Sequence, residues 1–133
     1  MKKKKVLVVD DEESIREMLG RALDYLGVDV ALAKNGAEAL ACLEANPFEL
    51  LITDNKMPVM IGLDLIQLVR SLEGDIGAIP IIFMSGDAED VLPGGRTLRE
   101  VALSSGANIV LDKPLDMESF LIKVLGLLKL RCG

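Results

Sequence analysis

Short runs of mostly apolar, often β-branched residues recur along the chain and are separated by longer segments with a different pattern. The runs occupy residues 6–9, 50–53, 79–84 and 108–111. None of them alternates between apolar and polar positions, as a strand with one face in solvent would. We therefore predict strands of a parallel sheet that helices cover on both faces.

The segments between these runs carry an apolar residue at every third or fourth position, which is typical of a helix packed on one face. Ser14 is expected to begin the first helix, a weaker strand to follow over residues 29–33, and a second helix to occupy residues 37–45. Residues 86–96 carry no such stripe and include a Pro-Gly-Gly sequence, which predicts a long loop before the fourth helix. The clearest stripes are Ile15, Met18, Leu19, Ala22 and Leu23 near the start of the chain, and Met117, Phe120, Leu121, Val124 and Leu128 near its end.

Strands and helices thus alternate, and this order predicts a chain of βα units. Right-handed crossovers between parallel strands wind such a chain into an open sheet with helices on both faces. The predicted fold is an α/β doubly wound sheet of five parallel strands with five helices, in the flavodoxin-like strand order 2-1-3-4-5. We expect residues 1–133 to form one domain, because this length supports one hydrophobic core.

A doubly wound sheet binds its ligands beyond the carboxyl ends of its strands. The residues at those ends are Asp10 and Asp11 after the first strand, Asp54 after the third, Ser85 after the fourth and Lys113 after the fifth. Each of them alone has an ordinary structural explanation, as a helix cap, a strand end or a solvated lysine. Together they predict a crevice with three carboxylates, a hydroxyl and an ammonium group.

Carboxylates that lie within a few ångström of one another either raise a pKa or recruit a cation. The chain contains no histidine, so oxygen ligands and a hard ion are expected. Mg²⁺ fits, because it is usually held by one or two carboxylates together with phosphate oxygens. An ionised aspartate can attack an activated phosphorus atom when a metal and hydrogen-bond donors meet the phosphoryl charge. The pattern therefore favours an aspartyl phosphate site.

Charge and hydropathy exclude several other classes of protein. A net charge of −6 and a pI near 4.7 disfavour a surface that tracks nucleic-acid phosphates. The basic start of the chain leads into acidic residues at 10–13, so no apolar stretch of export length follows it. Residues 120–130 are interrupted by lysines and are shorter than the ~20 residues of a spanning helix. We expect a cytoplasmic protein with no membrane contact and no direct nucleic-acid contact.

The fragments VLVVDDE, ITDNKMP, FMSG and DKP, at their spacing in this chain, resemble the response regulator receiver family over nearly the whole length. The resemblance implies a phosphorylation switch of a two-component system, with Asp54 as the residue that accepts the phosphoryl group. It implies that Ser85 and Lys113 contact the phosphoryl oxygens and act with Asp54 as the catalytic residues. The Mg²⁺ ligands that it implies are Asp11, Asp54, the backbone carbonyl of Lys56 and, mostly through water, Asp10.

By the same resemblance, the phosphoryl donor is a sensor histidine kinase or a histidine phosphotransfer protein, and the output reaches a downstream protein target that the sequence does not identify. Because the chain has no histidine, the donor must be another molecule. Such domains phosphorylate themselves and slowly remove the phosphoryl group, and they do not turn over an external substrate. The family also leads us to expect a cis peptide bond between Lys113 and Pro114.

Two features depart from the family's usual pattern. Val110 stands where an aromatic residue is common, three positions before Lys113, and this puts an aromatic switch coupled to the Ser85 hydroxyl in doubt. The stretch from Ser85 to Lys113 is also longer than usual. In addition, Lys56 and Asp87 are expected to pair across the mouth of the site and to hinder the water that hydrolyses the aspartyl phosphate, which predicts a long-lived phosphorylated state.

Other interpretations of the sequence stay open. The main alternative is a receiver-like interaction module that signals without phosphorylation, because Val110 and the long loop disturb the usual output. A flavodoxin or a nucleotide-binding protein is disfavoured, because the acidic residues 10–13 repel phosphate and neither GxGxxG nor a P-loop follows a strand. Additional leucines of the last helix indicate either a homodimer or partner surface, or extra burial, at Leu125, Leu127 and Leu130.

Overall fold

The computed structural model describes residues 3–132, and the side chains of residues 3–129. Its centre is a sheet of parallel strands in the order β2-β1-β3-β4-β5. This arrangement confirms the predicted doubly wound α/β fold and its strand order. The strands are β1 (Lys5–Val9), β2 (Asp29–Ala33), β3 (Leu50–Asp54), β4 (Ile81–Ser85) and β5 (Ile109–Asp112).

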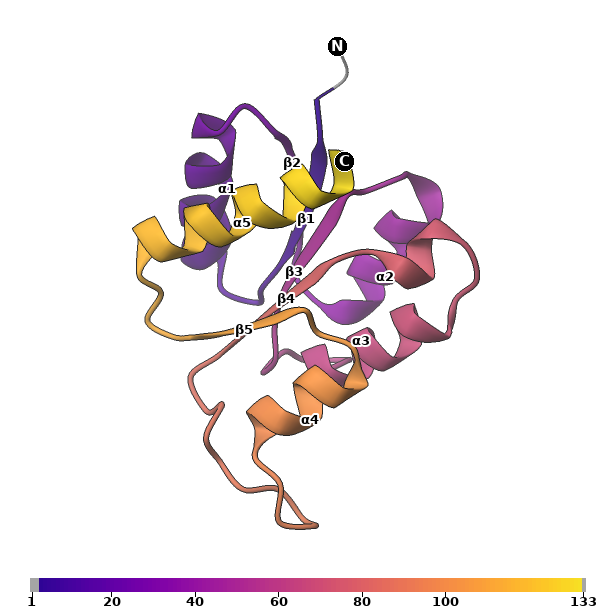
Figure 1. Ribbon diagram of the computed structural model, residues 1–133, viewed down its shortest axis with the longest axis vertical. Helices are drawn as coiled ribbons and strands as arrows, with labels where there is room; N and C mark the ends of the chain where they lie inside the picture. Colours follow the sequence, from indigo (N-terminus) through magenta and orange to yellow (C-terminus); the bar gives the residue numbers. More distant parts are fainter. Residues whose placement is uncertain (1–2, 133) are drawn as a thin grey trace.

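Helices lie on both faces of the sheet (Figure 1). They are α1 (Glu13–Tyr25), α2 (Gly36–Ala45), α3 (Gly62–Ser71), α4 (Leu98–Ser105) and α5 (Met117–Cys132), with a short 3₁₀ helix, η1 (Asp75–Ala78), before β4. The apolar sides of α1 and α5 pack on one face, whereas those of α2, α3 and α4 pack on the other. Among the residues described, no helix is both long and apolar enough to cross a membrane.

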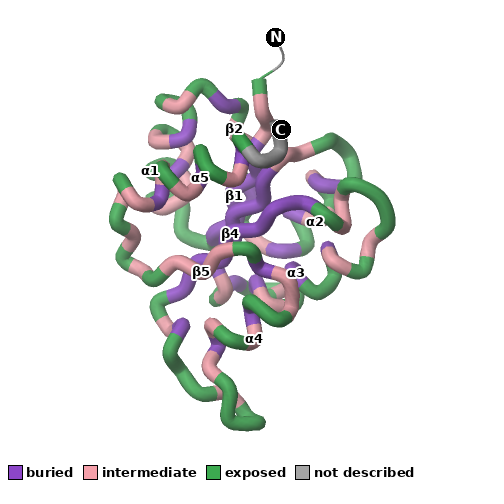
Figure 2. Tube along the Cα trace, in the orientation of Figure 1, coloured by how far each residue is buried: buried purple, intermediate pink, exposed green. Residues whose placement is uncertain are grey.

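The core consists of two apolar layers, one on each side of the sheet. Successive residues of a strand point to opposite faces, so Leu7 and Val9 pack with α2, α3 and α4, while Val6 and Val8 pack with α1 and α5. Every residue of β3 and β4 is buried, whereas the edge strands β2 and β5 are partly exposed (Figure 2). Burial on both faces explains why the apolar runs do not alternate.

Several element boundaries differ by one or two residues from the sequence predictions, among them the starts of the first helix and of the fourth strand. The first helix begins at Glu13, so the prediction of Ser14 is wrong by one residue. The reason is that Asp10, which lies before the helix, accepts a hydrogen bond from the amide of Glu12 (3.0 Å) and starts the turn earlier. The fourth strand begins at Ile81 and not at residue 79, because Pro80 has no N–H to extend the ladder. The third, fourth and fifth strands each end one residue later than predicted, at Asp54, Ser85 and Asp112.

The segment between β4 and α4 is the predicted long loop, and it projects from the body of the molecule at the bottom of Figure 1. Val91 and Thr97 form an isolated antiparallel bridge. The turn between them places Gly94 and Gly95 at positive φ (105° and 86°), which glycine adopts at no steric cost. Thr97 then caps α4 in a capping box with Glu100. The loop therefore leaves the end of β4 and returns to a well-defined helix start.

Candidate functional site

The carboxyl ends of β1, β3, β4 and β5 bring the predicted polar residues together at one edge of the sheet. Asp10, Asp54 and Ser85 are buried there, and Asp11 is exposed beside them. A pocket of about 270 Å³ opens between these strand ends. The residues that line it are Asp11, Glu12, Asp54, Lys56, Ser85, Gly86, Asp87 and Lys113.

One ammonium group connects two of the carboxylates. Lys113 Nζ lies 2.9 Å from Asp10 Oδ2 and 3.1 Å from Asp54 Oδ1. The main-chain amide of Lys113 donates to the carbonyl of Ser85 (3.0 Å), and the Lys113–Pro114 peptide bond is cis, as expected. Because these carboxylates are shielded from water, the lysine offsets a repulsion between Asp10 and Asp54 that solvent would not screen well.

The pKa values at the site reflect both burial and the crowding of negative charge. Burial raises the pKa of the Asp54 carboxyl, and the charge of Asp10 raises it further, although Lys113 and a main-chain hydrogen bond at Asn55 act in the opposite direction. Burial lowers the pKa of Lys113, but its hydrogen bond to Asp10 and the charges of both aspartates prevail, so the pKa lies above its ordinary value. Lys113 therefore stays charged, and a further cation would favour the ionised form of Asp54.

The residues that follow β1 form an acidic group. One carboxylate oxygen from each of Asp10, Asp11 and Glu12 lies within 4.8 Å of the others. Such a set of oxygen donors suits a hard divalent cation, and Mg²⁺ in particular. The group contains the predicted ligands Asp10 and Asp11 and adds Glu12, which the sequence analysis did not select. The other two predicted ligands, Asp54 and Lys56, line the same pocket.

Neighbours that the sequence analysis missed hold the main chain at Asp54. The buried hydroxyl of Thr53 donates to the Asp54 carbonyl (2.8 Å). The start of α3 lies against the same carbonyl, because an ideal Cβ on Gly62 would stand 2.1 Å from its oxygen. Asn55 accepts from the amide of Gly62 at its carbonyl (2.9 Å) and from that of Leu63 at its side chain (3.0 Å). A glycine at the first position of the third helix is the sequence signal that could have revealed this packing.

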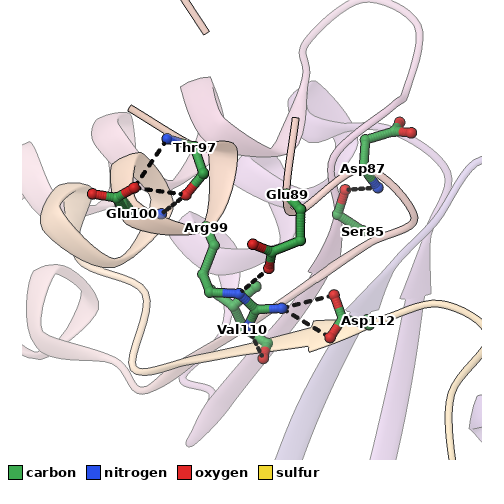
Figure 3. A network of polar contacts seen from close by, with 8 residues as sticks. All are labelled: Ser85, Asp87, Glu89, Thr97, Arg99, Glu100, Val110 and Asp112. Atoms are coloured by element: carbon green, nitrogen blue, oxygen red, sulfur yellow. Dashed lines mark hydrogen bonds and ion pairs between the residues drawn. The ribbon is translucent and has the colours of Figure 1, made fainter. Parts of the chain in front are cut away.

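The rim of the pocket carries the predicted ion pair. Lys56 Nζ lies 2.6 Å from Asp87 Oδ2, so the predicted pairing of these residues is confirmed. The hydrogen bond and the charge of Asp87 raise the pKa of Lys56. The amide of Asp87 also donates to the Ser85 hydroxyl oxygen (2.9 Å; Figure 3). The start of the long loop is thereby tied both to Ser85 and to the segment that follows Asp54.

Arg99 of α4 joins the long loop to β5, as Figure 3 shows. Its Nε donates to Glu89 of the loop (2.7 Å), and its Nη2 donates to both carboxylate oxygens of Asp112 (2.7 and 2.8 Å). Its Nη1 donates to the main-chain carbonyl of Val110 (3.3 Å). Because Asp112 directly precedes Lys113, this network reaches the edge of the pocket. Arg99 could not be selected from the sequence, because its partners come from two other segments, the long loop and β5.

Comparisons with known proteins agree with the fold. The family model of the response regulator receiver domain matches residues 6–125. The CAI-1 autoinducer sensor kinase/phosphatase CqsS of Vibrio cholerae is 36% identical over 121 residues, which are 91% of this chain and 17% of CqsS. The response regulator MprA of Mycobacterium bovis is 34% identical over 125 residues, which are 94% of this chain and 50% of MprA.

Solved structures show the same fold. The chemotaxis response regulator CheY4 of Vibrio cholerae is 31% identical with a TM-score of 0.80, and the match covers 94% of this chain and 98% of that one. The receiver domain of the Francisella response regulator 1452 is 28% identical with a TM-score of 0.81, covering 98% and 99%. The architecture is therefore that of a CheY-like signalling domain. The chain belongs to the response regulator receiver family of two-component systems, and it spans half the length of MprA.

Proposed function

We propose that this chain is a phosphorylation-dependent signalling switch in which Asp54 accepts a phosphoryl group. One observation carries the proposal: the ammonium of Lys113 lies within hydrogen-bond distance of the carboxylates of both Asp10 and Asp54. This contact brings a carboxylate that can attack phosphorus and a cation that can stabilise phosphoryl oxygens into one pocket.

In the proposed reaction, a carboxylate oxygen of Asp54 forms a bond to phosphorus while the bond from phosphorus to the donor's leaving group breaks. The ammonium of Lys113 is placed to contact one phosphoryl oxygen. The hydroxyl of Ser85 can donate its hydrogen to another, because its oxygen accepts from the amide of Asp87 and the hydroxyl hydrogen is left to donate. Asp54, Ser85 and Lys113 are therefore the proposed catalytic residues.

Asp10, Asp11, Asp54 and the carbonyl of Lys56 are the proposed Mg²⁺ ligands, Asp10 mostly through water. Two observations support them: the close carboxylate oxygens after β1, and the pKa of Asp54, which burial and then the charge of Asp10 raise and which a bound cation would lower. When bound, Mg²⁺ would neutralise charge on the phosphoryl oxygens.

The phosphoryl donor is proposed to be a sensor histidine kinase or a histidine phosphotransfer protein, and the output a protein target in the cytoplasm. The relatives support this role, since one is named a sensor kinase/phosphatase and another a response regulator. The exposed Ile122 and Leu125 of α5 support a homodimer or partner surface, whereas Leu127 packs partly against the core. The side chain of Leu130 lies outside the described residues.

An interaction module that signals without phosphorylation is the second candidate function. The network around Arg99 favours it, because ion pairs already tie α4 to β5 next to a valine, Val110, at which the family usually has an aromatic ring. A module of this kind would present the same α4 and β5 surface whether or not Asp54 is modified.

Incubation with Mg²⁺ and acetyl phosphate separates the two candidates. The phosphorylation switch is expected to gain the mass of one phosphoryl group in an adduct that is stable in acid and labile in alkali, and Asp54→Asn should abolish it. Beryllofluoride should shift the amide NMR signals of Ser85 and Lys113 in the wild type only. A folded wild-type protein that shows neither response would refute the switch and leave the second candidate.

A further inference from the structure

Arg16 in the second turn of α1 reaches back to the end of β1. Its Nη1 donates a hydrogen bond to the main-chain carbonyl of Asp10, at 2.7 Å. The side chain is half-buried, and its own amide continues the helix by donating to the carbonyl of Glu12 (3.1 Å). The guanidinium thus ties the first helix to the peptide that joins Asp10 to Asp11.

Every polar group of Asp10 has a partner. Its amide donates to Ala33 (3.1 Å), its Oδ1 accepts from the amide of Glu12 (3.0 Å) and its Oδ2 accepts from Lys113 (2.9 Å). Arg16 takes the remaining group, the carbonyl oxygen. Because both carboxylate oxygens are bonded elsewhere, the contact of Arg16 is with the main chain and serves geometry more than charge balance.

The carbonyl of Asp10 and the amide of Asp11 belong to one planar peptide unit. A donor that fixes the carbonyl oxygen therefore fixes the plane from which Asp11 begins. The Asp11 side chain is exposed, in contrast to the fully buried Asp10, so packing does little to hold it and the main chain fixes only the point from which it starts. Its carboxylate nevertheless lies within 4.8 Å of those of Asp10 and Glu12.

We propose that Arg16 is a positioning residue that holds the peptide between Asp10 and Asp11 so that the Asp11 carboxylate faces a divalent cation. This inference rests on the proposed function. Residues that orient metal ligands typically contribute about 10- to 100-fold to metal affinity. Removal of Arg16 should therefore weaken Mg²⁺ binding even though it removes a positive charge near the acidic group.

The direction in which the Mg²⁺ affinity changes distinguishes a positioning role of Arg16 from a purely electrostatic one. Loss of a nearby positive charge favours cation binding, so a purely electrostatic Arg16 predicts tighter Mg²⁺ binding in Arg16→Met. A positioning Arg16 predicts weaker binding, by about 10-fold. Arg21→Met is the matched control, because Arg21 also lies in α1, is exposed and has no part in the contact with Asp10.

The dissociation constant for Mg²⁺ alone is measured by titration of amide NMR signals, and the free energy of unfolding is measured in urea. The constant should rise about 10-fold in Arg16→Met, recover in part in Arg16→Lys, and stay near the wild-type value in Arg21→Met. Arg16→Gln, whose side chain is shorter, should behave like Arg16→Met and decides the result if Arg16→Met does not fold.

Tighter Mg²⁺ binding in Arg16→Met would overturn the inference, and two further results would do so in ways that can be told apart. If Arg16→Met and Arg16→Gln lose unfolding free energy but bind Mg²⁺ like Arg21→Met, Arg16 is only structural and the proposed function stands. If the wild-type chain itself fails to bind Mg²⁺, the metal site of the proposed function fails as well.

Discussion

Replacement of Gly62 by alanine tests how closely α3 constrains the phosphoacceptor segment. Gly62 is the first residue of α3, and an ideal Cβ there would stand 2.1 Å from the Asp54 carbonyl oxygen and 3.0 Å from the Asn55 Cα. Both atoms belong to the main chain, so no side-chain rotation can make room. Either α3 or the Asp54 main chain must move by about 1 Å to restore an ordinary contact distance.

A displacement of this size has two measurable costs. Overpacking against the main chain destabilises by about 2–3 kcal/mol. A chain of 133 residues has an unfolding entropy of about 0.28 kcal/mol/K, so the melting temperature of Gly62→Ala should fall by about 7–11 °C. A misplacement of a reacting group by about 1 Å can lower a rate by about 100-fold, and phosphorylation by acetyl phosphate should slow to that extent.

Calorimetry and single-turnover phosphorylation measure the two effects. Gly126→Ala is the matched control, because Gly126 also lies in a helix and a Cβ there would meet nothing within 4 Å. That change should stabilise the chain by about 0.5–1 kcal/mol and leave phosphorylation unchanged. If Gly62→Ala has the melting temperature of the wild type and is phosphorylated at the wild-type rate, the packing of α3 against Asp54 is not rigid and the reasoning is refuted.

Three further changes test the electrostatics and the packing of the domain. The raised pKa of Asp54 means that the folded chain binds the proton of this carboxyl more tightly than the unfolded chain does. The contribution of Asp54 to the free energy of unfolding therefore falls as the pH rises above 3.8, the ordinary pKa of the group. In urea without divalent ions, Asp54→Asn should therefore be more stable than the wild type at pH 7 and equal to it below pH 3.8; equal stability at both pH values would contradict this. Asp87→Ala should speed the release of inorganic phosphate from the phosphorylated protein, because Lys56 loses its partner at the rim of the pocket, and rapid release from the wild type itself would refute the predicted long-lived state. Arg70→Met should lower the free energy of unfolding in urea by about 3 kcal/mol, because three main-chain carbonyls lose a charged donor; a much smaller loss would show that water replaces the guanidinium.

The strands could be predicted because burial on both faces leaves a direct trace in the sequence. The runs that became β1, β3 and β4 are apolar at successive positions, and the structure buries all or nearly all of their residues. The first residues of the helices were harder to predict from the sequence. α1 begins one residue before Ser14 because the carboxylate of Asp10, a residue of the preceding loop, takes the Glu12 amide, and a local pattern contains no information about that contact.

The charged residues of the site could be selected because the strand-end rule places them by topology alone. Asp10, Asp54, Ser85 and Lys113 each follow or end a predicted strand, and the parallel sheet brings those ends to one edge. Their spacing could not be predicted. The distances of 2.9 and 3.1 Å from Lys113 to the two aspartates depend on the relative heights of strands that are far apart in the chain.

Three of the residues that the sequence did not reveal share one property, which is that they act on the main chain. Thr53 and Arg16 donate to carbonyl groups, and Gly62 matters because it leaves space beside one. Every residue has a main-chain carbonyl, and almost every residue has a main-chain N–H. A side chain that binds one of these groups therefore requires no particular residue type in its partner, and the sequence does not mark the contact. A carboxylate and an ammonium can be selected from a sequence because both groups are rare at strand ends. The residues that hold the main chain beside them are of common types, and their role can be recognised only when the fold brings the segments together.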